Sequence, residues 1–307
     1  MLEIKAGELA GIISVYKGTE PDDMPLLSRF NNLITDNGLR LIGSTRTYIS
    51  ECFIGSGSST PVASQTSLDN MLSYSNSNQS DTRGANTDDP LNQYVYRRVR
   101  YRFSPTGSAY NVSEIAFGDG VLGDNLFNRA LAKDTSGSPT TISVLGDEYL
   151  DVELEIRVYP PLADMTGSFA PTGKDTAGRT WTARAAGYGG VLTDDILDGW
   201  SAYGNFVEGR YQQSGGYGYA SNSALPPIFS NIPNSFILDF GRSALHPTGA
   251  GYTKVVTAGL EDWNTTIRTV KLFGNSHVMN IEFDPPFVKT NKDIFKLTYT
   301  VTWGRRA

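Results

Sequence analysis

Strict alternation of apolar and polar residues is the clearest pattern in this chain, and it predicts β-strands. From Tyr149 to Tyr159, Leu, Val and Ile at every second position are separated by Asp, Glu and Arg, as in a strand with one buried face. The same alternation predicts strands over Phe295–Trp303 and Tyr94–Phe103. Arg97 interrupts the apolar face of the last of these, which favours a sheet edge or a β-bulge.

Shorter apolar runs separated by Gly, Asn, Asp, Ser and Pro predict further strands, whereas helical patterns are scarce. These runs cover residues 12–16, 48–54, 112–117, 141–145, 180–185, 235–240, 254–258, 267–273 and 278–283. The best helical candidate is Asp36–Gly43, with Asp36 as the N-cap and Gly43 as the C-cap. The polar stretch Ser73–Pro90 is expected to be a long exposed loop. The predicted fold class is all-β, with long loops and little helix.

Two domains are expected, because the two halves of the chain have similar ends. In each half, a predicted strand ends in Phe-Gly, at Phe117-Gly118 and at Phe273-Gly274. A loop and then a long strand with alternating apolar and polar residues follow in both halves. This similarity is consistent with a duplication. The Pro160-Pro161 pair after the first long strand cannot continue a ladder. The predicted organisation is two β-sandwich-like domains, residues 1–161 and 162–307.

Composition and charge narrow the classes of function. The 307 residues include only 19% charged residues, 32 Gly and 15 Pro, and the formal net charge is −6. This charge gives no general attraction for nucleic acid, so no nucleic-acid partner is expected. Cys52 is the only cysteine, which excludes an internal disulfide framework. Without a long apolar run or the pattern of a secretory signal, we expect assembly in a cytoplasm and no membrane insertion.

The motifs that would carry catalysis are weak. Gly118–Gly123 matches the dinucleotide pattern G-x-G-x-x-G, but neither the helix nor the βαβ unit that a phosphate site needs is predicted around it. Acid pairs such as Asp194-Asp195 stand beside turn residues, where carboxylates usually cap turns; the sequence leaves calcium open. His246 and His277 are the only imidazoles, which excludes a His-rich metal site. We expect no enzyme activity, no cofactor and, apart from the open question of calcium, no metal.

An arginine run in the strand over Tyr94–Phe103 is a candidate interface charge patch. It consists of Arg97, Arg98, Arg100 and Arg102. Those on one strand face are expected to meet an acidic strand such as residues 151–155, in the same chain or in a neighbouring copy, through charge-assisted hydrogen bonds. The alternative is ordinary cross-strand pairing on a solvated sheet face.

Residues 187–222 are rich in glycine and aromatic side chains and are a second candidate for recognition or subunit contact. Residues 211–223 carry no charge and combine Tyr, Gly, Ser and Asn, as adaptable recognition loops do. The alternatives are a plain surface loop or a segment ordered only against another subunit. The candidate contact residues are Trp200, Tyr203, Tyr211, Tyr217 and Tyr219.

Several stretches resemble structural proteins of tailed bacteriophages. Phe30–Gly43 (FNNLITDNGLRLIG) and Cys52–Pro61 (CFIGSGSSTP) resemble the opening of tail-associated and fibre-like virion proteins. Similar phrases stand at Leu126–Leu131, Pro139–Val144, Asp147–Val152 and Phe283–Arg305. None of these stretches carries a catalytic residue, so the resemblance implies a role and no active site.

The resemblance implies a non-enzymatic, homo-oligomeric structural component of a virion, in the tail tip or baseplate, a fibre or the neck collar. The implied partners are other virion proteins and, for host attachment, a host surface polysaccharide. A capsid decoration or head-fibre protein is an alternative position. A glycan-binding adhesin and a polysaccharide-cleaving enzyme are alternative functions. The implied location is the virion, after assembly in the host cytoplasm.

Overall fold

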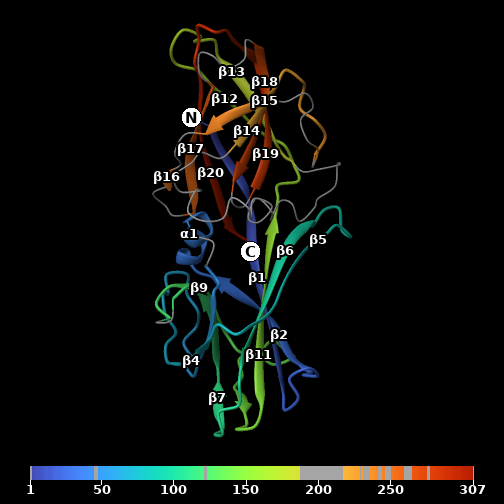
Figure 1. Ribbon diagram of the computed structural model, residues 1–307, viewed down its shortest axis with the longest axis vertical. Helices are drawn as coiled ribbons and strands as arrows, with labels where there is room; N and C mark the ends of the chain where they lie inside the picture. Colours follow the sequence, from blue (N-terminus) through green and yellow to red (C-terminus); the bar gives the residue numbers. More distant parts are fainter. Residues whose placement is uncertain are drawn as a thin grey trace. The chain divides into compact units, whose positions relative to one another are not determined.

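The chain is all-β, as the alternation predicts (Figure 1). A computed structural model describes residues 2–44, 48–120, 123–186, 217–228, 230, 236–240, 244–245, 250–258, 265–274 and 277–306. Within these ranges α1 is the one helix. The finer prediction, two sandwich-like domains related by duplication and divided at residue 161, stays a prediction.

The secondary-structure elements have the following bounds. They are β1 (Leu2–Gly18), β2 (Leu26–Ile34), α1 (Asp36–Ser44), β3 (Glu51–Gly55), β4 (Met71–Ser75), β5 (Asn78–Asn86), β6 (Tyr94–Phe103), β7 (Tyr110–Val112), β8 (Glu114–Gly118), β9 (Leu126–Leu131), β10 (Ile142–Val144), β11 (Tyr149–Tyr159), β12 (Met165–Phe169), β13 (Arg179–Ala185), β14 (Tyr217–Ser221), β15 (Phe236–Phe240), β16 (Ala244–Leu245), β17 (Gly251–Ala258), β18 (Thr265–Gly274), β19 (His277–Lys289) and β20 (Phe295–Arg305).

The chain divides into two compact units, and each is built from separate stretches of sequence. Unit 1 comprises Met1–Glu8, Ala85–Val95 and Tyr159–Trp303, and unit 2 comprises Leu9–Gly84, Tyr96–Val158 and Gly304–Ala307. The long strands β1, β6, β11 and β20 each contribute residues to both units.

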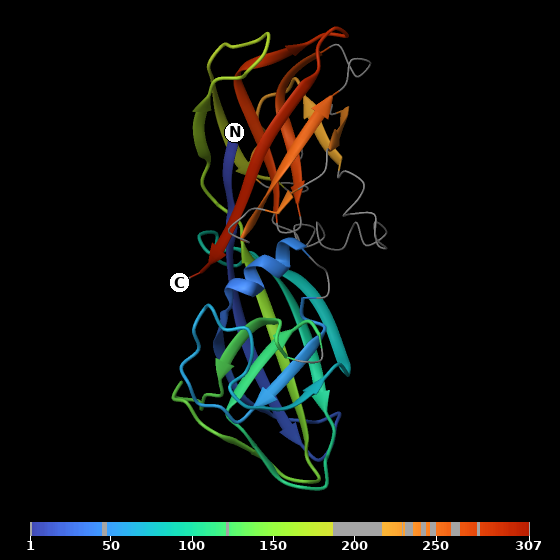
Figure 2. The same cartoon turned by 90° about the vertical axis from the view of Figure 1, so that its left-hand side faces the viewer.

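Unit 1 holds one antiparallel sheet in the order β12-β13-β19-β18-β14-β15-β17-β20, with β16 also paired to β17. The twist of the β18 to β20 strands is visible in Figure 2, where they are coloured orange to red. Three phenylalanine rings pack together in this unit. The Phe287 ring lies 5.2 Å from that of Phe283 and 5.1 Å from that of Phe295, both edge-on, a geometry that aromatic pairs favour.

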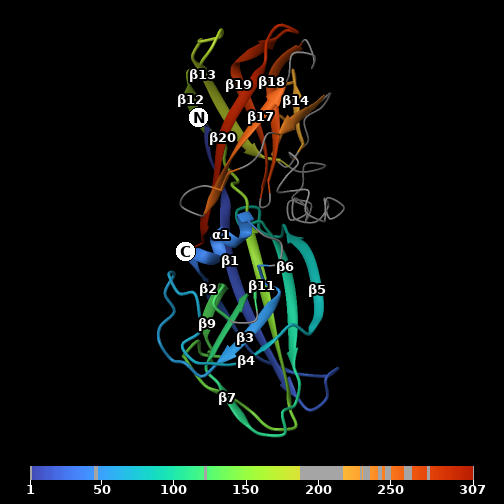
Figure 3. The same cartoon turned by 60° about the vertical axis from the view of Figure 1, so that its left-hand side comes forward.

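Unit 2 contains an antiparallel sheet in the order β2-β9-β8-β3-β4, which can be followed in Figure 3. The earlier residues of β2 pair instead with β1, and β11 pairs with β6. Strand β2 therefore pairs with β1 through its earlier residues and with β9 through its last two. A strand is shared in this way where a sheet turns a corner. Phe53, Leu68, Ala116 and Leu126 form a buried hydrophobic cluster in this unit.

Three predicted elements agree closely with the structure. Strands β6 and β11 have the predicted bounds, and β20 extends the predicted C-terminal strand by two residues, to Arg305. Strand β6 neighbours both β5 and β11, so of the two alternatives the sheet edge is wrong, and the β-bulge stays a prediction. Gly118 ends β8 and pairs with Leu126 at the start of β9; the described residues between them, 119–120 and 123–125, belong to no helix.

Two local predictions are wrong. The helix is capped by Thr35, whose Oγ1 accepts a hydrogen bond from the Gly38 amide at 2.8 Å, so Asp36 is its first residue and Gly43 lies inside it. Residues 73–90 contain most of β4 and all of β5. Most side chains of these two strands are not buried, so the sequence shows no alternation of apolar and polar residues there. Backbone hydrogen bonds to neighbouring strands hold them instead, and such pairing leaves no pattern in the sequence.

Candidate functional site

The arginines of β6 and the acids of β11 form ion pairs on one face of unit 2. Arg98 Nε donates to Glu155 Oε2 at 2.7 Å. Arg100 Nε and Arg102 Nε donate to the two oxygens of Asp151, each at 2.8 Å. The acids that these arginines meet therefore come from a paired strand of the same chain.

Both acids lie beneath their arginines. The Asp151 and Glu155 side chains are 0% and 2% exposed, whereas Arg29, which also binds Glu155 at 3.0 Å, is 43% exposed. Burial by itself would raise the pKa of Glu155, but hydrogen bonds from Arg157 and Arg98 outweigh it and lower that pKa. Because long arginine side chains cover this polar face, β11 is buried on both faces, contrary to the half-buried strand predicted.

Glu153 is the exception in this row of acids. Burial raises the pKa of its carboxyl group, and the nearby charges of Arg98 and Arg100 only partly oppose this. Among the described residues, no hydrogen bond or salt bridge holds this carboxylate. Glu153 is therefore an acid with neighbouring cations but without a fixed partner.

Two tyrosines lie against the same arginines. The Arg100 guanidinium carbon is 4.0 Å from the centre of the Tyr16 ring, and that of Arg98 is 4.3 Å from the centre of the Tyr96 ring. Such cation–π contacts stabilise a guanidinium in one orientation. They also cover one face of each ring.

Arg97 does not belong to this face. Successive side chains of a strand point to opposite sides, and Arg97 Nε and Nη2 donate to Asp81 on β5 at 2.9 and 2.7 Å. Burial raises the pKa of the Tyr48 hydroxyl beside it, and the charge of Arg97 partly opposes that rise. The candidate patch is thus divided between two faces.

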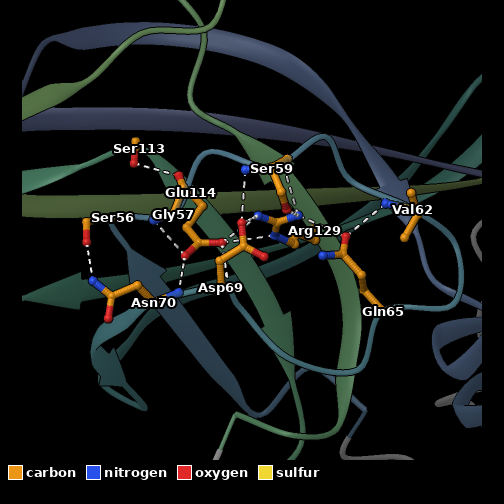
Figure 4. A network of polar contacts seen from close by, with 10 residues as sticks. All are labelled: Ser56, Gly57, Ser59, Val62, Gln65, Asp69, Asn70, Ser113, Glu114 and Arg129. Atoms are coloured by element: carbon orange, nitrogen blue, oxygen red, sulfur yellow. Dashed lines mark hydrogen bonds and ion pairs between the residues drawn. The ribbon is translucent and has the colours of Figure 1, made fainter.

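A second polar network, which the sequence did not predict, lies inside unit 2 (Figure 4). Arg129 on β9 donates through Nε and Nη2 to Glu114 on β8, at 2.9 and 2.8 Å. Both side chains are 0% exposed. Arg129 also binds Asp69 at 2.8 Å and donates to Gln65 at 2.8 Å. A buried ion pair of this kind is sustained only when further hydrogen bonds satisfy both partners.

The network fixes the loop between β3 and β4. Glu114 accepts hydrogen bonds from the amides of Gly57 and Asn70 at 2.8 Å and from that of Asp69 at 3.1 Å (Figure 4). A Cβ atom at Gly57 would collide with the Glu114 carboxylate, so glycine is required for this close approach. A loop of mostly exposed residues is thereby held at both ends by one buried carboxylate.

A third set of contacts joins the start of α1 to β9. The Thr35 hydroxyl donates to the Leu126 carbonyl at 2.7 Å, and the Thr35 amide donates to the Phe127 carbonyl at 2.9 Å. Asn37 donates to the Asn125 side chain at 2.7 Å. Helix α1 is therefore attached to β9 by hydrogen bonds from its cap residue Thr35 and to the residue before β9 by Asn37.

The aromatic candidates are only partly described. Trp200, Tyr203 and Tyr211 lie outside the described residues. Tyr217 and Tyr219 belong to β14, which pairs with β15 and β18, so the loop expected over residues 211–223 is a strand at residues 217–221. His277 begins β19, and His246 lies outside the described part.

In the described part of the chain, no group of three or more His, Cys, Asp or Glu side chains is placed to hold a metal ion. No helix in the same part is long and apolar enough to span a membrane. No protein-family model, curated protein or solved structure matches this chain.

Proposed function

We propose that the protein is a non-enzymatic structural component of a tailed-phage virion, in the tail tip or baseplate, a fibre or the neck collar. It acts with other virion proteins, as a homo-oligomer, and takes part in host attachment. The proposal begins from the sequence stretches that resemble virion proteins. The structural support for the proposal is the set of hydrogen bonds that joins some of these stretches.

Three of the six resembling stretches, Phe30–Gly43, Cys52–Pro61 and Leu126–Leu131, form one hydrogen-bonded module in unit 2. Phe30–Gly43 supplies the end of β2, the Thr35 cap and most of α1, and Leu126–Leu131 is β9. The two are joined through Thr35. Cys52–Pro61 supplies most of β3 and the start of the loop bound by Glu114 and Arg129. Stretches far apart in sequence thus build one local structure, which is the observation that carries the proposal.

The chemistry of this module is that of a scaffold. The Glu114 carboxylate, which could otherwise act as an acid or base, accepts hydrogen bonds from Arg129 and from loop amides. Polar groups held in this way stabilise one loop conformation. A fixed loop on a rigid sheet suits a protein whose role is to present surfaces to neighbours.

Particle purification tests the proposal. Particles of the phage that encodes this chain are purified by density gradient, and the chain is quantified by mass spectrometry against a known coat protein. We expect a fixed number of copies per particle. A phage carrying Arg129→Met should yield fewer complete particles than one carrying the exposed control Arg268→Ala. Absence of the chain from infectious particles would refute the proposed role.

A further inference from the structure

The loop between β1 and β2 (residues 19–25) carries free acids. Glu20, Asp22 and Asp23 are exposed, and their carboxylates have no hydrogen bond or salt bridge to any described residue. The loop is fixed all the same, because Arg102 Nη2 donates to the Pro21 carbonyl at 2.7 Å. The acids therefore stand at the Arg102 end of the ion-paired face.

The other end of that face is cationic. Arg29, Arg98 and Arg157 all bind the single buried carboxylate of Glu155. Asp151, which marks the acidic end, is four residues from Glu155 along β11, or about 13 Å at the usual rise of a strand. The three arginines outnumber Glu155 and the neighbouring Glu153 at one end, whereas Glu20, Asp22 and Asp23 add negative charge at the other.

Some guanidinium N–H groups at the cationic end are not used in hydrogen bonds to the described residues. Arg98 uses only Nε in its bond to Glu155, and Arg29 uses only Nη2. Their side chains are 36% and 43% exposed. The remaining guanidinium N–H groups meet no acceptor among the described residues. Because Glu155 already orients both side chains, little conformational entropy is lost when a second carboxylate binds them.

We propose that two copies of this chain pair through this face about a two-fold axis, with the 19–25 loop of each copy against Arg29, Arg98 and Arg157 of the other. A two-fold contact needs a self-complementary surface, and a face with opposite charges at its two ends is self-complementary. A second copy also fits better than a sugar, because a guanidinium group already covers one face of each of the Tyr16 and Tyr96 rings. The proposal deepens the proposed structural role by naming a partner.

Charge reversal tests the pairing on the full-length purified chain. The mass is measured by sedimentation equilibrium in 0.05 M and 0.5 M salt, and we expect a dimer that salt weakens. Asp22→Lys/Asp23→Lys should raise the dimer dissociation constant at least about tenfold. The matched control Asp88→Lys/Asp89→Lys makes the same charge change at another exposed acid pair and should leave the constant unchanged.

Mixing two variants tests the two-fold geometry itself. Arg29→Glu places an acid at the cationic end, so its own dimer should also weaken. An equimolar mixture of Arg29→Glu with Asp22→Lys/Asp23→Lys should form heterodimers, because both contacts are attractive again. If Arg29→Glu fails to fold by circular dichroism, Arg29→Ala replaces it, with partial recovery expected.

The outcomes separate this inference from the proposed function. A monomeric wild-type chain, or a dimer that withstands Asp22→Lys/Asp23→Lys, would overturn the pairing, whatever the particle measurement shows. Heterodimers formed by two variants that are monomeric alone would support it, even if the chain were absent from particles.

Discussion

Replacing Arg129 by methionine should remove most of the stability of the loop between β3 and β4. Methionine retains much of the apolar volume but leaves the Glu114 carboxylate buried without its cation. Breaking a fully buried ion pair in this way costs about 3–5 kcal/mol. Glu114 is 0% exposed, so water cannot replace the guanidinium without opening the loop.

The measurement is urea unfolding followed by circular dichroism, together with hydrogen exchange of the Gly57, Asp69 and Asn70 amides. These amides donate to Glu114, so their exchange should accelerate more than that of the β6 amides. Arg268→Ala is the matched control, because Arg268 is 45% exposed and forms an ion pair with Glu282 away from the proposed contact. We expect a loss of less than about 1 kcal/mol there.

Two results would contradict this prediction. If Arg129→Met lowers the free energy of unfolding by no more than Arg268→Ala does, the buried pair is not what holds the loop. Unchanged exchange of the Gly57 and Asn70 amides would lead to the same conclusion.

Three further predictions concern the helix and the acid row. Thr35→Val should lower the free energy of unfolding by about 1–2 kcal/mol through loss of the helix cap, whereas Thr35→Ser should keep most of the wild-type stability. Denaturant unfolding of the two variants measures both values. Gly38→Ala, normally stabilising in a helix, should here destabilise in thermal unfolding, because its Cβ would overlap the Phe127 carbonyl; Gly304→Ala, with open space around it, should be neutral. Glu153→Gln should stabilise at pH 7 by less than about 1 kcal/mol, since the half-exposed carboxylate is screened by solvent. Burial raises the pKa of Glu153, so this gain should vanish near pH 3, where the group is protonated in both states; a gain that persists at pH 3 would contradict the reasoning.

Alternation predicted the long strands because each has a continuous apolar face against a core. It gave no information about what covers the other face. On β11 the polar side chains at Asp151 and Glu155 read as solvated, yet arginines from β2 and β6 bury them. Burial by neighbouring side chains within one sheet leaves no periodic signal, and only the pairing of strands reveals it.

The Glu114–Arg129 pair had a weak signal that was available in the sequence. Each is the lone charged residue of a mostly apolar strand, in the stretches EIAFG and LFNRAL. A charge at such a position is rare without a partner. The sequence could thus have marked both residues, but it could not pair them, because 15 residues separate them and the contact depends on the register of the β8–β9 hairpin.

Electron cryo-microscopy of intact particles tests the central claim most directly. The claim is that this chain is a structural part of a virion, built as copies that contact one another. The account predicts density for several symmetry-related copies in the tail, a fibre or the neck, with the Phe30–Gly43 and Cys52–Pro61 module ordered in each. Particles that are complete and infectious but contain no density for the chain would contradict it.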